Sequence, residues 1–335
     1  MRKIKIDAVL MNKAKVFRDS LFVREGVVMG KPKDRLEKLK GRLGKIKHKK
    51  HIKYLQLLID NYDEIQIATP KEMVKWIKDF EDVLHVGEIS EKAKNKKKKF
   101  WEEIVQALRY NDLQKIEYPN YLRKENIKTC VYCNAQSCLV VQPQYYDSKK
   151  KSKIKITRPR FEIDHYYPKS KYPYFGTSFF NLYPSCSSCN NVKRESKALF
   201  ELYTEDDDLE VFNFRIDDLD LIDKHLKLNK RNKNIKVFLE PIDMDFRLLN
   251  NHNKLFSVQA IIDENADIVE ELFLKSKLYS TAYKNSLVSG LGKIFNDTSI
   301  IDRLIIGNYS KPEDIHKRPM AKFTQDIARQ LNLIK

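Results

Sequence analysis

The sequence contains no long apolar run, and runs such as residues 139–141 and 300–301 span only a few positions. A membrane-spanning helix needs about 20 consecutive apolar residues, so none is expected. Basic residues at the N-terminus, Arg2, Lys3 and Lys5, are not followed by the apolar segment of a secretory signal peptide. We therefore expect a cytoplasmic protein with no membrane partner.

Glycine is scarce as well, with 9 residues among 335, and no internal repeat is visible. A collagen-like chain is excluded by this count, and a fully disordered chain is excluded by the 42% hydrophobic content. The 17 Phe and 17 Tyr residues can supply a core. The length fits about two domains of ordinary size.

Basic residues exceed acidic ones, 64 to 46, and the excess of +18 is unevenly distributed. Residues 1–129 carry 32 basic and 19 acidic side chains, residues 130–200 carry 12 and 4, and residues 201–335 carry 20 and 23. The excess thus lies wholly in the first 200 residues. Lys-rich surfaces can simply solvate a fold, but a segregated excess points to a polyanion such as nucleic acid. The slightly acidic last third is the expected docking surface for a protein partner.

Hydrophobic spacing divides the chain into three regions. Residues 1–128 form a basic helical N-terminal region, with helices predicted at residues 11–23, 31–60 (broken by Gly41 and Gly44), 71–80 and 100–110. The lysine-rich run at residues 92–99 is either a solvated loop or a phosphate contact. Residues 129–205 form a central domain with short strands at 139–141, 154–156 and 161–165, a basic turn at 149–153 and a helix at 190–200. Residues 206–335 are mostly helical, with strands near 211–216 and 235–239 and helices at 268–291 and 320–333. The predicted fold class is α+β, mainly α.

Four of the five cysteines form two pairs, Cys130-x-x-Cys133 and Cys186-x-x-Cys189. Disulfides are not expected in the cytosol. Two such pairs match a tetrahedral structural zinc site, and the 52 residues between them imply an insert. The fifth cysteine, Cys138, needs no role beyond packing.

Between the cysteine pairs lies an unusual succession of polar residues. Asp164 and His165 follow a predicted strand, Asn181-Leu182 comes next, and Asn190 directly follows the last cysteine of the second pair, with Lys193 three residues on. Each element alone is common and most often structural. Their order inside a zinc frame resembles the HNH nuclease family, which has the ββα-metal fold.

The resemblance covers roughly residues 129–200. It rests on the following positions: Cys130, Cys133, Asp164, His165, Pro168, Asn181, Leu182, Cys186, Cys189, Asn190 and Lys193. Residues 164–173 and 181–190 are also similar to the HNH subunit of Septu-type anti-phage systems. That likeness implies a defence effector acting on phage or plasmid DNA with an ATPase partner subunit.

Roles follow from the resemblance only at matching positions. His165 matches the general base that activates water, Asp164 the metal-binding carboxylate, and Asn181 the residue that holds the loop and orients the histidine. Asn190 stands where many members have His, and its amide oxygen suits Mg²⁺ or Mn²⁺. Whether Asn190 or Asn191 is the ligand stays open.

The same resemblance implies that the chain is a metal-dependent endonuclease that hydrolyses DNA phosphodiester bonds. In this reaction a cation neutralises the charge that develops on the phosphate and the leaving oxygen. Lys193 and Lys169 are the candidate phosphate contacts. Two alternatives remain: a non-catalytic zinc module that binds nucleic acid, in which Asp164 and His165 only pack, and an adaptor that works through protein contacts. Sequence specificity, the choice between DNA and RNA, the activation trigger and the oligomeric state are not encoded in the pattern.

Overall fold

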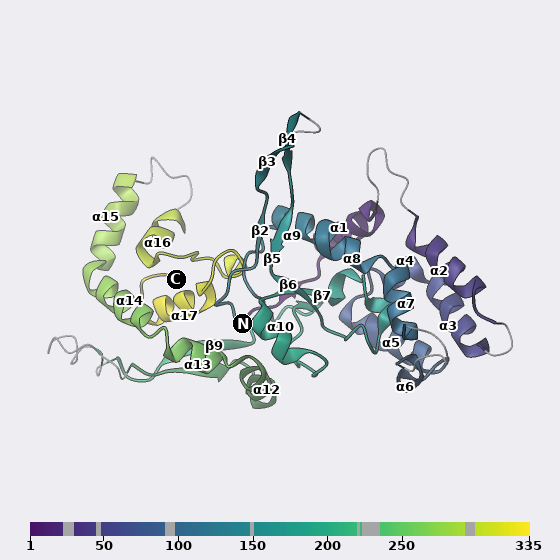
Figure 1. Cartoon of the computed structure of the whole chain (residues 1–335). Helices are drawn as coiled ribbons and strands as arrows, with labels where there is room; N and C mark the ends of the chain where they lie inside the picture. The colour runs from purple at the N-terminus through teal and green to yellow at the C-terminus, as the bar shows by residue number, and fades with distance from the viewer. Residues whose placement is uncertain are drawn as a thin grey trace.

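The computed structural model describes residues 1–22, 30–44, 48–90, 98–147, 151–219, 222, 235–291 and 299–335. It is a mixed α/β structure, 54% helical with small sheets, so the prediction of a mainly helical mixed fold is confirmed at this level. Helices of the first third lie at one end of the molecule, the small sheets lie in the middle, and the last helices lie at the other end (Figure 1).

The four predicted N-terminal helical segments are present, and α4, α6 and α9 are additional. Asp7 caps the first helix by accepting the Leu10 N–H at 2.7 Å, and Thr69 and Glu72 form a capping box on α5. The predicted break at Gly41 and Gly44 separates α2 from α3. Residues 23 and 45–47 of these predictions lie outside the described residues. The helices are α1 Ala8–Ser20, α2 Pro32–Gly41, α3 Lys49–Asp60, α4 Tyr62–Ile65, α5 Pro70–Glu81, α6 Val86–Ile89, α7 Phe100–Ala107, α8 Tyr110–Asp112 and α9 Tyr118–Glu125, with a π-helical turn at Leu113–Glu117.

A strand pair followed by a short helix lies at the centre of the molecule. Strand β6 (Glu162–His165) runs antiparallel to β7 (Leu182–Ser185), with Asp164 opposite Tyr183, and helix α10 (Ser187–Lys193) follows β7. Short 3-10 turns at Pro173–Phe175 and Phe179–Asn181 lie in the connection. The predicted helix at 190–200 is wrong in its bounds, because Cys186 caps α10 and Arg194, at φ 43°, ends it.

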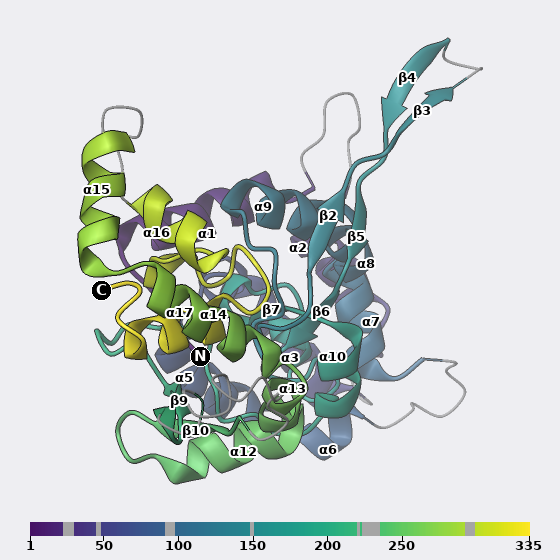
Figure 2. The same ribbon diagram turned by 90° about the vertical axis from the view of Figure 1, so that its left-hand side faces the viewer.

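A long β-hairpin between the two cysteine pairs projects away from the body. Its base pairs β2 (Leu139–Val141) with β5 (Arg158–Arg160), and its outer part pairs β3 (Gln144–Asp147) with β4 (Ser152–Lys155), all antiparallel. Figures 1 and 2 both show it extending beyond the neighbouring helices. We call these four strands the arm. Residues 148–150 of the predicted basic turn lie outside the described residues.

The C-terminal third combines two small sheets with helices. Strand β8 (Tyr203–Thr204) pairs in parallel with β1 (Ile4–Lys5), and β9 (Phe212–Ile216) pairs antiparallel with β10 (Val237–Pro241). The predicted strands and the helix at 320–333 are found here with small shifts, whereas the helix predicted at 268–291 is divided into two at Tyr279 and Ser280. The helices are α12 Phe246–Phe256, α13 Val258–Asp263, α14 Asp267–Leu278, α15 Thr281–Leu291, α16 Ser299–Ile306 and α17 Ala321–Gln330, with a 3-10 turn at Pro312–Asp314.

One hydrophobic core cluster joins all three regions. The Tyr118 hydroxyl of α9 donates to the Leu182 carbonyl of β7 at 2.7 Å, and the Met1 amino group donates to the Phe212 carbonyl of β9 at 3.0 Å. The region boundaries at residues 128 and 205 stay a prediction. In the described ranges, no helix combines the length and the apolar character that a bilayer span requires.

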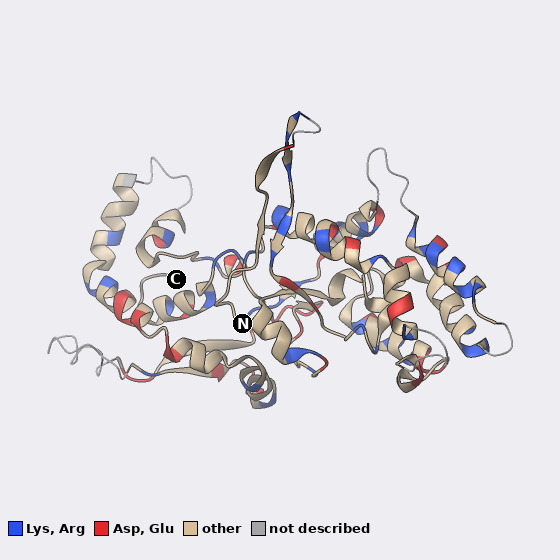
Figure 3. Ribbon diagram, viewed as in Figure 1, with Lys and Arg blue, Asp and Glu red and all other residues tan. Residues whose placement is uncertain are grey.

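Lys and Arg positions are spread along the ribbons of the N-terminal helices and the arm (Figure 3). Of the lysine-rich run predicted at residues 92–99, residues 92–97 lie outside the described residues. Of the two lysines that follow, Lys98 donates to Gln106 at 2.7 Å and Lys99 immediately precedes α7.

Candidate functional site

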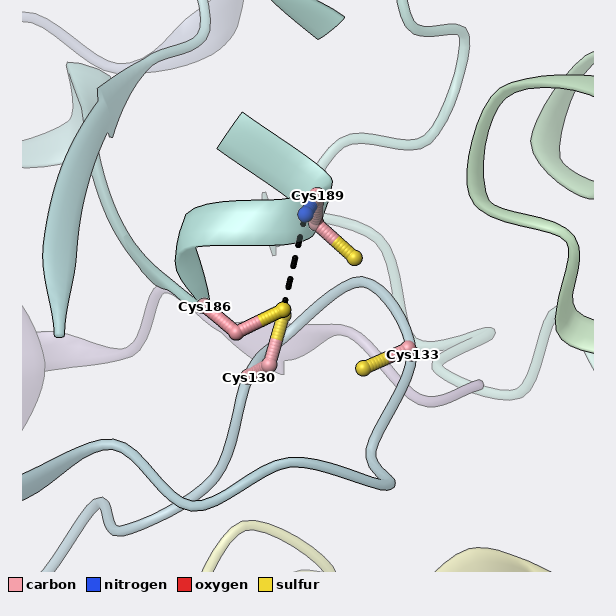
Figure 4. A group of neighbouring side chains, drawn as sticks. All are labelled: Cys130, Cys133, Cys186 and Cys189. Carbon is pink, nitrogen blue, oxygen red and sulfur yellow. Dashed lines mark hydrogen bonds between the residues drawn. The ribbon is translucent and has the colours of Figure 1, made fainter. Parts of the chain in front are cut away.

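Four cysteine side chains from two distant segments meet in one cluster. Cys130 and Cys133 precede the arm, whereas Cys186 and Cys189 lie at the start of α10. Their sulfur atoms all lie within 4.8 Å of one another (Figure 4). Four thiolates at this spacing form the usual donor set of a structural zinc site. The cluster can hold a metal such as zinc.

Local hydrogen bonds shape both cysteine turns. The Asn134 N–H donates to the Cys130 carbonyl at 2.9 Å, and Asn134 adopts a left-handed conformation, which Asn tolerates better than most residues. In the second pair the Cys186 sulfur accepts the Cys189 N–H at 3.5 Å, so one thiol both caps α10 and faces the cluster. The Asn134 side chain also donates to the Ile315 carbonyl at 2.8 Å, which ties the first turn to the C-terminal region.

Burial sets the protonation state of these thiols when no cation is bound. Burial raises the pKa of the Cys130 thiol to about 12, so this group is protonated at neutral pH unless a cation replaces the proton. A coordinated thiol is deprotonated outright. The donor set and its burial therefore fit zinc, and four protein ligands leave no open coordination position for substrate.

His165, the last residue of β6, is held in one orientation. Its ring centroid lies 4.8 Å from that of Tyr110 in α8, and its Nε2 lies 3.0 Å from the Gly176 carbonyl oxygen. Because a carbonyl only accepts, this contact assigns the proton to Nε2 and leaves the lone pair on Nδ1. Burial, assisted by the charge of Lys169, lowers the pKa of His165 to about 3, so the ring is neutral at neutral pH.

Asn181 is fully buried and fastens the loop that follows His165. Its side-chain oxygen accepts the Tyr167 N–H at 2.7 Å, and its Nδ2 donates to the Tyr167 and Phe175 carbonyls at 3.1 and 3.0 Å. Its own carbonyl accepts the Tyr166 N–H at 3.0 Å. Through these bonds Asn181 fixes both ends of the segment that brings the Gly176 carbonyl to His165.

Asp164 and Lys193 form a buried ion pair between β6 and α10. The Lys193 Nζ lies 3.0 Å from Asp164 Oδ2 and donates to the His165 carbonyl at 2.8 Å, and the Tyr132 hydroxyl donates to Asp164 at 2.5 Å. Burial raises the pKa of Asp164, and the Lys193 charge offsets this only in part. The prediction that Lys193 contacts a phosphate is wrong, because its side chain is fully buried and its ammonium is already bound.

Asn190 faces β6 from α10, next to a carboxylate that the sequence did not single out. Its Nδ2 donates to Glu162, which lies on the same strand face as Asp164 because side chains alternate along a strand. Asn191 is exposed, so the arrangement favours Asn190 as the residue directed toward the strand. Asp164 offers about four lone-pair sites, and its contacts with Tyr132 and Lys193 use up to three of them. The carboxylate oxygens of Asp164 and the amide oxygen of Asn190 are the kind of ligand that a hard cation such as Mg²⁺ prefers.

A cavity of about 290 Å³ brings several of these residues together. Four predicted site residues line it: Asp164, His165, Lys169 and Asn190. Asn181 and Lys193 are not in its lining. They hold residues that are, because Asn181 fastens the loop after His165 and Lys193 pairs with Asp164. The Lys169 ammonium lies 4.6 Å from the Tyr110 ring centroid, and burial lowers the pKa of this amine.

Two further lining residues were missed by the sequence reasoning. Trp101 comes from α7, so the N-terminal helices contribute to the cavity, although the sequence placed this residue only within the helix predicted at 100–110. Arg194, directly after Lys193, is exposed and lines the cavity, with its Nε donating to the Asn191 carbonyl at 2.9 Å. Two adjacent basic residues at 193–194 could have indicated a phosphate contact. Of the two, Arg194 is the one exposed to solvent.

Comparisons of the chain with protein-family models, with curated proteins and with solved structures gave no match. The interpretation of the site therefore depends on its own geometry and chemistry.

Proposed function

We propose that the protein is a metal-dependent endonuclease of the HNH type that hydrolyses DNA phosphodiester bonds. The observation that supports this most strongly is the placement of His165. Its Nε2 is held by the Gly176 carbonyl, which leaves Nδ1 as the acceptor, and the residue lines a cavity together with Asp164 and Asn190. A histidine that merely packs does not need a carboxylate and an amide beside it.

The proposed reaction uses these residues in separate roles. His165 accepts the proton of the attacking water at Nδ1, while its Nε2–H stays on the Gly176 carbonyl. Asp164 and Asn190 would hold the divalent cation, which neutralises charge on the phosphate when it is bound. Lys169 and Arg194, both in the cavity lining, provide positive charge toward the same anion.

The zinc cluster has a structural part in this proposal. Cys186 and Cys189 lie at the start of α10, which carries Asn190, whereas Cys130 and Cys133 flank Tyr132, which donates to Asp164. A cation shared by the four thiolates would therefore fix α10 and Tyr132 relative to β6. No cysteine lines the cavity described above.

A plasmid-nicking assay tests the proposal and separates it from the alternatives. Supercoiled DNA should be nicked with Mg²⁺ or Mn²⁺ and left intact with EDTA, and cutting should return when Mg²⁺ is added in excess. Zinc is measured in the same samples, so that loss of the structural metal is not mistaken for loss of the catalytic one. Binding of DNA without cutting under any metal would instead favour the non-catalytic zinc module.

The defence role and the ATPase partner follow only from the resemblance and form the second part of the proposal. The slightly acidic residues 201–335 would carry the partner contact, away from the basic residues that face DNA. Expression together with the neighbouring gene's product should yield a stable complex with ATPase activity. If neither phage resistance nor such a complex is found while nicking persists, the nuclease assignment stands alone.

A further inference from the structure

The arm is a strongly basic element, and only its base is held to the rest of the fold. In the described part of the chain, β3 pairs only with β4, and a two-stranded ribbon has little stability of its own. Its base is anchored, since Thr157 donates to the Asn120 side chain of α9 at 3.4 Å. Beyond the base it leaves the body in both views (Figures 1 and 2).

The strand register gathers aromatic and cationic side chains along the arm. Tyr146 is directly opposite Lys153, so these two side chains and Lys155 share one face of the ribbon. Tyr146 is 64% exposed, and both lysines are exposed. Tyr145 is paired differently, with the Arg158 guanidinium 5.2 Å from its ring centroid. Exposed aromatics interleaved with cations suit phosphate contacts and packing against sugars or bases.

We infer that the arm is a DNA-binding element that lies in the major groove of the duplex cut at the cavity. The major groove of B-DNA admits a two-stranded ribbon, whereas the narrow major groove of duplex RNA does not. This inference rests on the proposed function for the identity of the partner. It deepens that proposal by naming a second contact surface that is remote from the reacting atoms.

The position of the arm along the chain supports the inference. Strand β5 ends at Arg160 and β6 begins at Glu162, so the arm continues into the strand that carries His165. Lys153 precedes Glu162 by nine residues, which corresponds to about 30 Å of extended strand. Contacts of the arm with DNA would thus lie up to about 30 Å along the chain from the strand that carries His165.

Charge-neutral variants of the full chain test the arm. Lys153→Gln/Lys155→Gln/Arg158→Gln should weaken binding to a duplex DNA of about 30 base pairs roughly tenfold or more. The slope of log affinity against log salt should fall by about two to three, near 0.9 per lost phosphate contact. Tyr146→Ala should lower affinity while leaving this slope unchanged.

The matched control is Lys236→Gln/Arg247→Gln/Lys254→Gln, which removes the same charges from exposed positions on and near α12, on the far side of the body from the arm (Figure 1). It should change affinity less than about twofold. Equal binding by the arm and control variants overturns the arm proposal alone, and so does equal affinity for duplex RNA and DNA. If DNA binding depends on the arm but no DNA is cut, the proposed nuclease function is overturned and the arm proposal stands. If the wild-type protein does not bind DNA, both proposals are overturned.

Discussion

At the scale of single residues, burial of histidines outside the site has a measurable consequence. The Nε2–H of His252 donates to the Tyr132 carbonyl at 2.7 Å, and His316 is buried near the first cysteine turn. Burial lowers the pKa of His252 to about 3 and that of His316 to about 4. Both rings therefore resist protonation in the folded protein.

This burial predicts acid destabilisation between about pH 6.5 and pH 4. In that window the unfolded chain binds protons that the folded chain refuses, so the free energy of unfolding falls as the pH falls. From pH 7.5 to 5.5 each histidine should remove about 1.4 kcal/mol. Urea unfolding of wild type and His252→Gln at both pH values checks this, and a loss unaffected by the substitution would contradict it.

Single residues also show where sequence reasoning reaches its limit. The motif drew attention to Asn181, whose amide has both the donors and the acceptor that its buried loop uses. It misplaced Lys193, because the partner of a lysine depends on how α10 crosses β6, which spacing along the chain does not encode. Glu162 and Arg194 were overlooked for the same reason, although strand alternation and the basic pair at 193–194 offered weak signals.

At the scale of elements, the ion pair between Asp164 and Lys193 links helix α10 to strand β6. Removing one partner of a buried pair leaves an unpaired charge in the interior, which typically costs about 3–5 kcal/mol. Lys193→Met should therefore lower the free energy of unfolding at pH 7 by this amount. Chemical denaturation measures it, with zinc content as a check on the cluster.

The matched control for this pair is the double variant Asp164→Asn/Lys193→Met. It removes both charges, so most of the lost stability should return even though catalysis is not expected to. A single variant that loses less than about 1 kcal/mol would mean that the pair does not hold α10 in place.

Element boundaries were predictable where local chemistry sets them. The start of α5 is set by a capping box of Thr69 and Glu72 around Pro70. The break after α2 is set by Gly41 and Gly44. The arm was predicted only as short strands, because residues 139–160 do not reveal whether another element covers them. The start of α10 was missed because a cysteine, Cys186, acts as its cap.

At the scale of the whole molecule, the cysteine cluster closes a loop that contains the arm and β6. The 52 residues between the pairs separate turns that the metal would join. A cross-link across a loop of this length constrains the unfolded chain by about 4 kcal/mol. We expect one zinc per chain, and Cys186→Ser should lose it and lower the melting temperature on the order of 5 °C.

Cys138 supplies the control for that prediction, since it is also buried but lies outside the four-cysteine group. Cys138→Ala should retain zinc at the wild-type stoichiometry, measured by elemental analysis beside thermal unfolding. Zinc retained by Cys186→Ser, or lost from Cys138→Ala, would contradict the assigned ligand set.

The most direct test of the central claim is nicking by His165→Gln. Glutamine can still donate to the Gly176 carbonyl but has no basic nitrogen in place of Nδ1, so the site should keep its shape and lose its base. We predict that Mg²⁺-dependent nicking of supercoiled plasmid falls at least about a hundredfold, with DNA affinity and zinc content unchanged. Cutting by the variant at the wild-type rate would contradict the account.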